Sequence, residues 1–351
     1  MAQLVGGYAM RSVGEPLSPL EYEVQPGPGQ ALIEVVGCGV CHTDLGFLHE
    51  GVPTRHPLPL VLGHEISGVV REAPGAPELE GRSVVVPAVL PCGECELCAR
   101  GRGEICRRQV FPGNDVHGGF ASHVVVPARY LQPVDLPRGP ALAKLAVTAD
   151  AVSTAYQAVA RSGLGAGDVA VFVGVGGVGG FGAQIAKARG ARVVAIDVCE
   201  ERLAALAAVA DWTVCARDRA ADEVKREVRG LAKEHGLPPA EWRVFETSGT
   251  GPGQELAFGL LGFGGYLGVV GYHPRAVTLR LSNLMAFDAR AEGTWGCHPS
   301  RYPEVLALVR AGLVALDPFV ELHPLAEVNE VLERLRRGEL RRRPILLPGE
   351  S

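Results

Sequence analysis

The stretch that decides the fold is VAVFVGVGGVGGFGAQIAKARGARVVAID, residues 169–197. Its apolar run Val169–Val173 predicts a buried parallel strand, followed by an amphipathic helix over residues 181–189 and a second strand over residues 193–196. Between strand and helix lies GVGGVG, a G-x-G-x-x-G pattern at residues 174–179. A glycine-rich turn is the plainer interpretation of such a pattern. Because strand, glycines, helix and second strand occur in this order, the stretch instead predicts a dinucleotide-binding unit.

The glycines and the acid at the end of this stretch have separate tasks. The first glycine permits a tight turn, the second lets the backbone approach a pyrophosphate, and the third lets helix and strand pack closely. The N-terminus of the helix offers N–H groups to the phosphates. Asp197 suits the hydroxyls of the adenosine ribose and favours NAD over NADP, although Arg192 and Arg202 are close enough in sequence to leave NADP open. The predicted cofactor-binding residues here are Gly174, Gly176, Gly177, Val178, Gly179 and Asp197.

Strands and helices alternate beyond Asp197. Strands are expected at Trp212–Cys215, 242–246 and 266–270, and helices at 200–210, 220–235 and 252–261. This alternation predicts an α/β fold whose doubly wound parallel sheet occupies residues 152–293. The rest of the chain, residues 1–151 and 294–351, is expected to form a second, β-rich domain. Near its end, the arginine-rich segment 334–343 is interpreted mainly as a solvated helix face.

Composition narrows the class of protein. The chain has 351 residues, of which 47% are apolar and 21% charged, and a net charge of −5. This charge argues against a general binder of nucleic acids or acidic membranes. There is no apolar run of transmembrane length and no basic-then-apolar leader at the N-terminus, so we expect a cytoplasmic protein. The nine cysteines are clustered and odd in number, which favours metal ligands over disulfides.

The sharpest metal signal is C-x2-C-x2-C-x7-C, formed by Cys92, Cys95, Cys98 and Cys106. Four thiolates can close a tetrahedron around zinc and leave no position for a substrate, so the predicted role is structural. An iron–sulfur site and disulfides are the rival interpretations.

A second candidate metal site combines Cys41, in GCGVCHTD, with His64, in LGHE. A catalytic zinc needs three protein ligands and an open position. Taken singly, Cys41 could be a buried thiol and His64 a hydrogen-bonded loop residue. Together with the cysteine loop, they favour a zinc site.

GVCHTD, GHE, the four-cysteine loop, GGFA and GVGGVG, in this order, resemble the zinc-dependent medium-chain alcohol dehydrogenases over essentially the whole chain. The resemblance implies a GroES-like catalytic domain and a Rossmann domain. It also implies NAD, two zinc ions per subunit (one catalytic, one structural), a small-molecule alcohol substrate and a homo-oligomer, either dimer or tetramer.

The resemblance further implies the roles of single residues. Asp150, six residues before Tyr156, takes the place of the third ligand of the catalytic zinc. Thr43 is expected to receive the substrate's proton, and Glu65 to be the glutamate behind the zinc. The cofactor contacts that it implies are His42 and Arg343 near the pyrophosphate, Thr154 and Val270 near the nicotinamide, and Arg202 near the adenosine ribose.

The chain departs from the family pattern at Gly46, where many relatives carry a histidine that passes the proton to solvent. His42 and His49 are possible substitutes, but neither matches that position. The proton could instead leave through ribose hydroxyls and water.

A narrower resemblance is to the 6-hydroxycyclohex-1-ene-1-carbonyl-CoA dehydrogenases of anaerobic benzoyl-CoA degradation. It rests on PGNDVHGGFASHVVVPAR (112–129), LRLSNLMAF (279–287) and GCGVCHTD. It implies NAD-dependent oxidation of a ring alcohol of an acyl-CoA substrate to the corresponding 6-oxo compound. The alternatives are a general NAD-dependent zinc alcohol or polyol dehydrogenase and, more remotely, a non-enzymatic zinc- or nucleotide-binding protein on the same fold.

Overall fold

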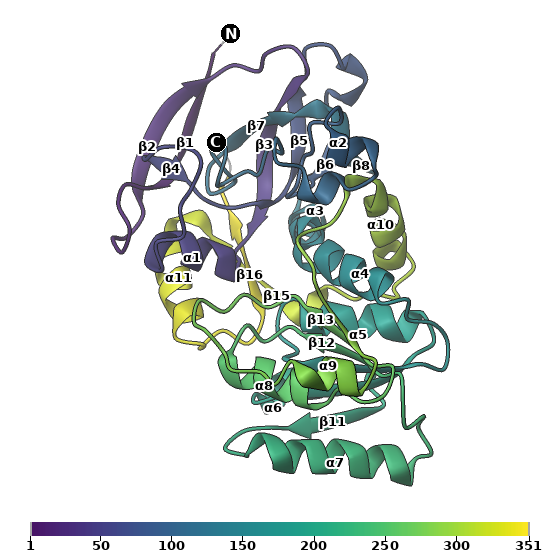
Figure 1. The fold of residues 1–351 in the computed structure, drawn as a ribbon. Helices are drawn as coiled ribbons and strands as arrows, with labels where there is room; N and C mark the ends of the chain where they lie inside the picture. Colours follow the sequence, from purple (N-terminus) through teal and green to yellow (C-terminus); the bar gives the residue numbers. More distant parts are fainter. Residues whose placement is uncertain (1, 350–351) are drawn as a thin grey trace. The chain divides into compact units, whose positions relative to one another are not determined.

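The computed structural model describes residues 2–349, which form two compact units (Figure 1). Unit 1 comprises the chain up to Ser153, Gly296–Leu306 and the chain from Val320 onward. Unit 2 comprises Thr154–Trp295 and Ala307–Phe319.

The segment Ala307–Phe319 was expected in the β-rich domain, but it packs within unit 2. The ring of Phe319 lies 5.7 Å from the ring of Phe181. The backbone N–H of Ala315 donates a hydrogen bond to Gln184 at 2.7 Å. Side-chain packing, which local sequence patterns do not report, therefore decides where this segment lies.

Unit 2 is built on a six-stranded sheet in the order β11-β10-β9-β12-β13-β14, with every pairing parallel. Its strands are β9 (Val169–Val173), β10 (Arg192–Asp197), β11 (Trp212–Cys215), β12 (Arg243–Glu246), β13 (Tyr266–Val269) and β14 (Arg290–Gly293). Its helices are α5 (Gly179–Ala188), α6 (Glu200–Ala205), α7 (Ala221–Glu234), α8 (Gly251–Gly259) and α9 (Ser282–Ala286), together with most of α4 (Ala151–Arg161). The predicted parallel sheet is confirmed.

The centre of this sheet follows from local sequence. All five residues of β9 are buried, as a strand covered on both faces requires. Gly190 ends the following helix with a φ of +82°, a conformation that glycine adopts without steric cost. Val173 lies opposite both Ile196 and Glu246 in the parallel register, so β9, β10 and β12 end at one edge. The glycine loop and Asp197 therefore meet there.

Strand β14 was not expected. Its sequence is RAEG, and none of its four residues is buried, so it carries no apolar run to predict a strand. It forms because its backbone pairs with β13, with Tyr266 opposite Arg290. The parallel sheet therefore extends one strand further than the sequence indicates.

Unit 1 contains two sheets. A three-stranded sheet has the order β2-β1-β4, and a seven-stranded sheet has the order β15-β16-β3-β5-β6-β8, with β7 also paired to β3. The strands are β1 (Gln3–Met10), β2 (Ser18–Val24), β3 (Gln30–Gly39), β4 (Leu60–Val61), β5 (Glu65–Glu72), β6 (Ser83–Val86), β7 (His123–Pro127), β8 (Gln132–Val134), β15 (Val320–Pro324) and β16 (Arg343–Leu347). The helices are α1 (His42–His49), α2 (Glu96–Ala99), α3 (Pro140–Lys144), α11 (Val328–Arg336) and the start of α10 (Tyr302–Arg310).

The register of the larger sheet brings three distant segments together. Gly39, the last residue of β3, lies opposite Glu65, the first residue of β5. Gly39 also lies opposite Ile345, two residues after the start of β16 at Arg343. The segments that carry Cys41, His64 and Arg343 therefore meet at one end of β3.

Candidate active site

Cys41, His64 and Asp150 form the first candidate metal site. Their ligand atoms all lie within 4.8 Å of one another, and Cys41 and His64 are buried. His64 Nε2 is 3.5 Å from Asp150 Oδ2, and Cys41 Sγ is 4.0 Å from the same oxygen. A thiol, an imidazole and a carboxylate that converge in this way fit zinc and leave one of four tetrahedral positions open.

His64 provides a test of whether the site fits a metal. Both of its ring nitrogens are buried without a hydrogen-bond partner, although Asp44 Oδ1 lies 3.6 Å from Nδ1. Burial opposes protonation of His64, but the carboxylates of Asp44 and Asp150 raise its pKa well above the usual range. A polar ring buried in this way needs a partner, and a metal ion at Nε2 satisfies it.

Asp44 belongs to the candidate site, although the sequence did not lead us to expect it there. It is fully buried, and its carboxylate accepts hydrogen bonds from Cys41 N at 2.8 Å and Gly63 N at 3.1 Å. Asp44 therefore connects the backbone of Cys41 to that of Gly63, the residue before His64. Its carboxylate also faces the His64 ring. The sequence signal that could have identified Asp44 is its place as the last residue of the GVCHTD motif.

Glu65 directly follows His64 in the sequence and is completely buried. Arg343 donates two hydrogen bonds to it, at 2.6 and 2.7 Å, and Ala151 N donates a third at 2.9 Å. Burial raises the pKa of Glu65, and the Arg343 guanidinium counteracts this. Because Ala151 follows Asp150 directly, Glu65 also holds the backbone beside the third ligand.

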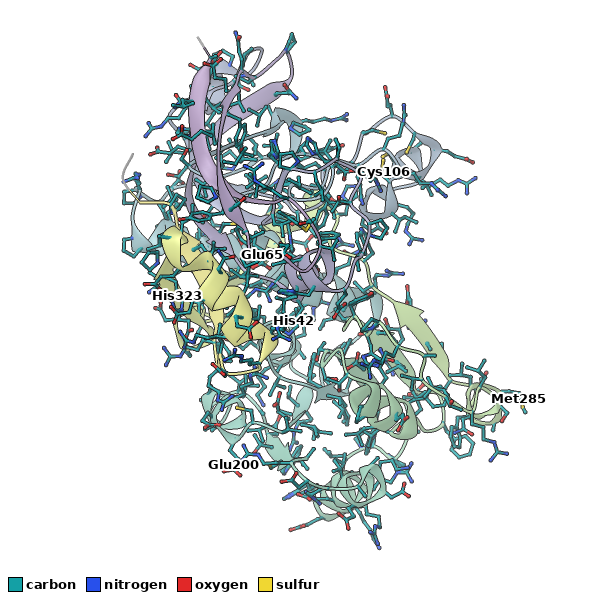
Figure 2. All side chains as sticks on the ribbon, turned by 90° about the vertical axis from the view of Figure 1, so that its left-hand side faces the viewer. His42, Glu65, Cys106, Glu200, Met285 and His323 are labelled. Atoms are coloured by element: carbon teal, nitrogen blue, oxygen red, sulfur yellow. The ribbon has the colours of Figure 1, made fainter. Side chains whose placement is uncertain are left out.

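The residues that follow Cys41 belong to α1, which Cys41 caps. The Thr43 hydroxyl is 3.5 Å from Cys41 Sγ, His42 is exposed, and Gly46 is buried. A Cβ at Gly46 would lie 3.5 Å from a Val52 methyl, which is an ordinary van der Waals contact. Figure 2 shows His42 and Glu65 in unit 1. The roles expected of these residues remain predictions.

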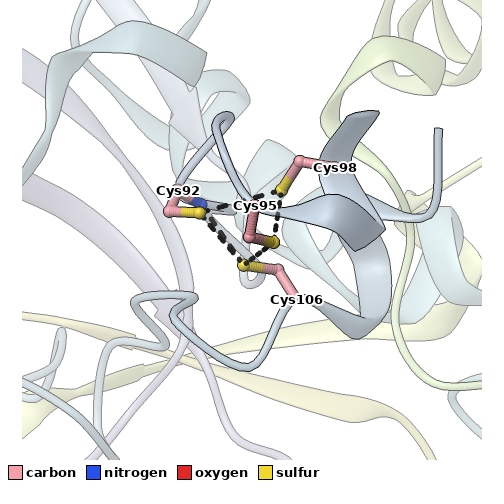
Figure 3. Close-up of side chains that lie close together, drawn as sticks. All are labelled: Cys92, Cys95, Cys98 and Cys106. Atoms are coloured by element: carbon pink, nitrogen blue, oxygen red, sulfur yellow. Dashed lines mark hydrogen bonds between the residues drawn. The ribbon is translucent and has the colours of Figure 1, made fainter. Parts of the chain in front are cut away.

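The four cysteines of the loop between residues 92 and 106 form the second candidate site (Figure 3). Their closest sulfur pairs are 3.5–3.9 Å apart, and all four thiols are free. A tetrahedron with Zn–S bonds of about 2.3 Å has S···S edges of about 3.8 Å, whereas a disulfide needs about 2.05 Å. The cluster therefore fits a single zinc ion. Figure 2 shows Cys106 on a loop that stands apart from Glu65.

The backbone of the cysteine loop favours thiolates. Hydrogen bonding from the Glu94 backbone lowers the pKa of Cys92 to about 6, and the Cys98 backbone lowers that of Cys95. Burial instead raises the pKa of Cys98 to about 12. N–H groups aimed at sulfur are what a metal-binding loop needs, because thiolate is the ligand form.

The glycine loop of unit 2 fits a dinucleotide. Gly174 has a φ of +88°, and a Cβ there would lie 2.5 Å from Ser248. A Cβ at Gly179 would collide with Gly174 O. A Cβ at Gly176, by contrast, would meet only Arg202, at 3.7 Å. Packing explains the first and third glycines, and the second leaves backbone accessible to a pyrophosphate.

The remaining predicted cofactor residues belong to different units. Asp197 is buried and accepts a hydrogen bond from Val175 N in the glycine loop at 2.7 Å. In the same unit, Thr154 is buried in α4, and Val270 follows β13. His42 and Arg343 belong to unit 1. Their contacts with the nicotinamide or the pyrophosphate remain predictions.

Glu246 is a buried acid that the sequence analysis did not single out as a site residue. It lies at the end of β12, and its Oε1 accepts hydrogen bonds from Ser248 N at 2.8 Å and Gly249 N at 3.1 Å. Burial raises the pKa of Glu246. It fixes the loop that packs against Gly174 and so supports the glycine turn.

Comparisons with known proteins agree with this architecture. The family model for the alcohol dehydrogenase GroES-like domain matches residues 27–137, and the model for the zinc-binding dehydrogenase matches residues 177–311. An alcohol dehydrogenase of Geobacillus stearothermophilus is 31% identical over 323 residues, which cover 91% of this chain and 92% of that protein.

Solved structures are similar over nearly the whole chain. A cobalt- and zinc-bound thermostable alcohol dehydrogenase from Pyrobaculum aerophilum has a TM-score of 0.84 and 28% identity, covering 99% of this chain and 100% of that chain. Acetophenone reductase from Geotrichum candidum, in complex with NAD, has a TM-score of 0.83 and 27% identity. The match covers 98% of this chain and 97% of that chain. The chain belongs to the zinc-dependent medium-chain alcohol dehydrogenase family and is an oxidoreductase. Within residues 2–349, no helix combines the length and the apolar character needed to cross a membrane.

Proposed function

We propose that this protein oxidises a secondary alcohol with NAD as the hydride acceptor. The observation that carries this proposal is the Cys41–His64–Asp150 site, whose three ligand atoms converge and leave a fourth position for a substrate oxygen. Bound zinc supplies a Lewis acid that lowers the pKa of a coordinated oxygen, and NAD supplies the redox chemistry.

The protein's own residues hold the reactants and move the proton. Cys41, His64 and Asp150 would hold the metal, and Thr43 Oγ1, 3.5 Å from the Cys41 sulfur, would accept the proton of the alcohol. The backbone at Gly176 receives the pyrophosphate, and Asp197 receives the ribose hydroxyls. Gly46 offers no ionisable side chain at the position where many relatives carry a histidine, so no group of the chain at this position would pass the proton to solvent.

The finer proposal is that the substrate is 6-hydroxycyclohex-1-ene-1-carbonyl-CoA, oxidised to the 6-oxo compound in anaerobic benzoyl-CoA degradation. The stretch 112–129, which carries the narrower resemblance, packs against Gly63, the residue before His64. A Cβ at Gly113 would lie 2.8 Å from Gly63 N, and the ring of Phe111, the residue just before this stretch, is 4.9 Å from the ring of His64. A general alcohol or polyol dehydrogenase without a CoA substrate is the rival, and the relatives named alcohol dehydrogenases favour it.

A substrate panel separates the two. Purified protein with NAD is mixed with the CoA thioester, with cyclohexanol and with a sugar alcohol, and NADH absorbance is followed. Turnover confined to the thioester supports the finer proposal. Turnover of the simple alcohols alone refutes it and keeps the metal-assisted oxidation. No turnover of any alcohol by zinc-loaded protein would refute the general proposal as well.

We also propose a homo-oligomer, dimer or tetramer, in the cytoplasm. β14 is an edge strand of the parallel sheet, and large apolar side chains in the same part of unit 2 are exposed: Phe263, Tyr272, Leu281, Met285 and Trp295. Free thiols throughout the described residues support a reducing compartment. Light scattering coupled to size exclusion gives the mass, and a monomer would contradict the oligomer.

A further inference from the structure

Asp150, the third ligand of the Cys41–His64–Asp150 site, lies at a break between two helical segments. The 3₁₀ helix Leu145–Ala149 ends directly before it, and α4 begins at Ala151, directly after it. The backbone of Asp150 itself has φ −139° and ψ −62°, which are not helical values. The last carbonyl groups of a helix have no partner within that helix. Contacts from elsewhere in the chain therefore hold the backbone that carries this ligand.

Two side chains from distant segments hold this backbone, one on each side of the break. On one side, Glu65 accepts a hydrogen bond from Ala151 N at 2.9 Å. On the other side, the Tyr302 hydroxyl donates a hydrogen bond to Ala149 O, the carbonyl of the residue directly before the ligand. Ala88 N donates to the same carbonyl at 3.2 Å. Tyr302 is 153 residues away from Ala149 in the sequence, so sequence spacing gives no hint of this contact.

Ser153 adds a second hydroxyl to this contact. Its Oγ lies 3.2 Å from the Tyr302 hydroxyl and 3.2 Å from Asp150 O, the carbonyl of the ligand itself. Ser153 and Tyr302 are both 0% exposed, so bulk water does not replace these hydrogen bonds. Burial also raises the pKa of Tyr302 well above its usual range, so its hydroxyl keeps its proton and remains a donor.

Tyr302 stands on a segment that is itself anchored. It begins α10, directly after the short helix Pro299–Arg301. The His298 ring caps that helix by accepting a hydrogen bond from Ser300 N at 3.2 Å. A Cβ at Gly103 would lie 2.6 Å from the His298 ring, so this segment packs against the four-cysteine loop. A group that positions another needs such a fixed base.

Resting on the metal site of the proposed function, we propose that the hydroxyls of Tyr302 and Ser153 are positioning groups for the third metal ligand. By holding the backbone at Asp150, they keep its Oδ2 3.5 Å from His64 Nε2 and 4.0 Å from Cys41 Sγ. Zinc accepts a carboxylate oxygen only at about 2.0–2.2 Å, so a small shift of this backbone changes the coordination. Tyr302 and Ser153 act through Asp150, and metal affinity reports their effect.

Competition with a chromogenic chelator, on the purified full chain, measures this affinity. Tyr302→Phe keeps the ring and removes only the hydroxyl, and affinity at the site should fall about tenfold, the lower end of the range for groups behind metal ligands. Ser153→Ala should lower it about threefold, the effect of one weak hydrogen bond. Because the two hydroxyls belong to one network, the double variant should lose less than the product of the two single losses.

Cobalt(II) substitution supplies a readout that a merely structural role would not move. The visible absorption of the cobalt protein reports how ligands are arranged around the ion. Cys41→Ser gives the spectrum of the four-cysteine cluster alone, and the band that remains after its subtraction should shift in Tyr302→Phe. Tyr266→Phe is the matched control, because Tyr266 is a buried tyrosine of unit 2 whose hydroxyl lies 3.5 Å from Glu292. It should change neither the affinity nor the band.

Thermal melting separates positioning from stability. A Tyr302→Phe variant that melts earlier but keeps the wild-type affinity and cobalt band would overturn the positioning role, and so would an equal loss of affinity in Tyr266→Phe. If Tyr302→Phe does not fold, Ser153→Ala decides by the same two readouts. Alanine is the better helix former, so this variant should fold, and wild-type values in it would overturn the proposal.

Failure of the proposed function gives different results. Wild-type protein that binds metal at the four-cysteine cluster alone would overturn the proposed function together with this inference. Wild-type protein that binds metal at both clusters but oxidises no alcohol would overturn the proposed function alone, because affinity and absorption are measured without substrate.

Discussion

The two metal-ligand clusters of unit 1 are built in opposite ways. The four cysteines come from one loop, lie within 15 consecutive residues and are mostly half-exposed. Cys41 and Asp150 are 109 residues apart, and their cluster is held by β3, β5 and the turn before α4. Four thiolates from one loop fill all four coordination positions of a zinc ion. Three ligands from distant segments leave one coordination position open for a substrate or water. Saturation points to a structural role and openness to a catalytic one.

The surroundings of the two clusters differ as well. Backbone N–H groups of the loop itself donate to each of the four sulfurs. Buried charged side chains surround the other cluster: Asp44 faces His64, and Glu65 pairs with Arg343. The Cys41–His64–Asp150 cluster therefore depends on residues from distant parts of the sequence. The four predictions below test this contrast.

The largest effect is expected from Cys41→Ser. Turnover of the alcohol should fall at least about a thousandfold, because a catalytic metal supplies several kcal/mol of transition-state stabilisation. Metal analysis should show that one of the two sites is lost, while NAD affinity, measured by titration, stays near that of the wild type. Undiminished turnover with a reduced metal content would contradict the catalytic role of the dispersed cluster.

Arg343→Met should lower the free energy of unfolding by about 3–5 kcal/mol, because it leaves the Glu65 carboxylate buried and unpaired. Denaturant unfolding measures this loss. The double variant Arg343→Met/Glu65→Gln removes both charges and should recover part of it. A double variant no more stable than the single one would show that lost packing, rather than the unpaired charge, causes the effect.

Cys95→Ser should destabilise the protein by about 3 kcal/mol, or roughly 10 °C in Tm, since loss of a metal belongs to the mechanisms behind large destabilisations. Calorimetry and zinc analysis measure both consequences. Cys215→Ser, a change at a free cysteine of β11 outside both clusters, is the control. Unchanged melting and zinc content in Cys95→Ser would rule out a structural metal in this loop.

The smallest effect is expected from Asp44→Asn, which keeps an acceptor oxygen but removes the charge that faces His64. Metal affinity at the dispersed cluster should fall about 10- to 100-fold, the usual effect of changing a group behind a metal-ligating histidine. Competition with a chromogenic chelator measures this affinity, and the four-cysteine cluster serves as the internal reference. A parallel loss at both clusters would indicate general destabilisation instead.

Local sequence determined much of this protein. The apolar run of β9, the glycines after it and the four closely spaced cysteines are each contained in a short stretch, and short-range sterics and spacing suffice to predict them. The parallel sheet followed from the alternation of strands and helices. The resemblance to a family added Asp150, which no local pattern marks as a ligand.

Only the tertiary structure decided the rest, because it depends on contacts between distant residues. Strand β14 forms by pairing with the backbone of β13 and needs no apolar pattern of its own. Asp44 faces His64, and Glu65 meets Arg343, because β3 fixes the register of β5 and β16. The sequence by itself determined which chemical groups are present, and the register of the strands decided which of them meet.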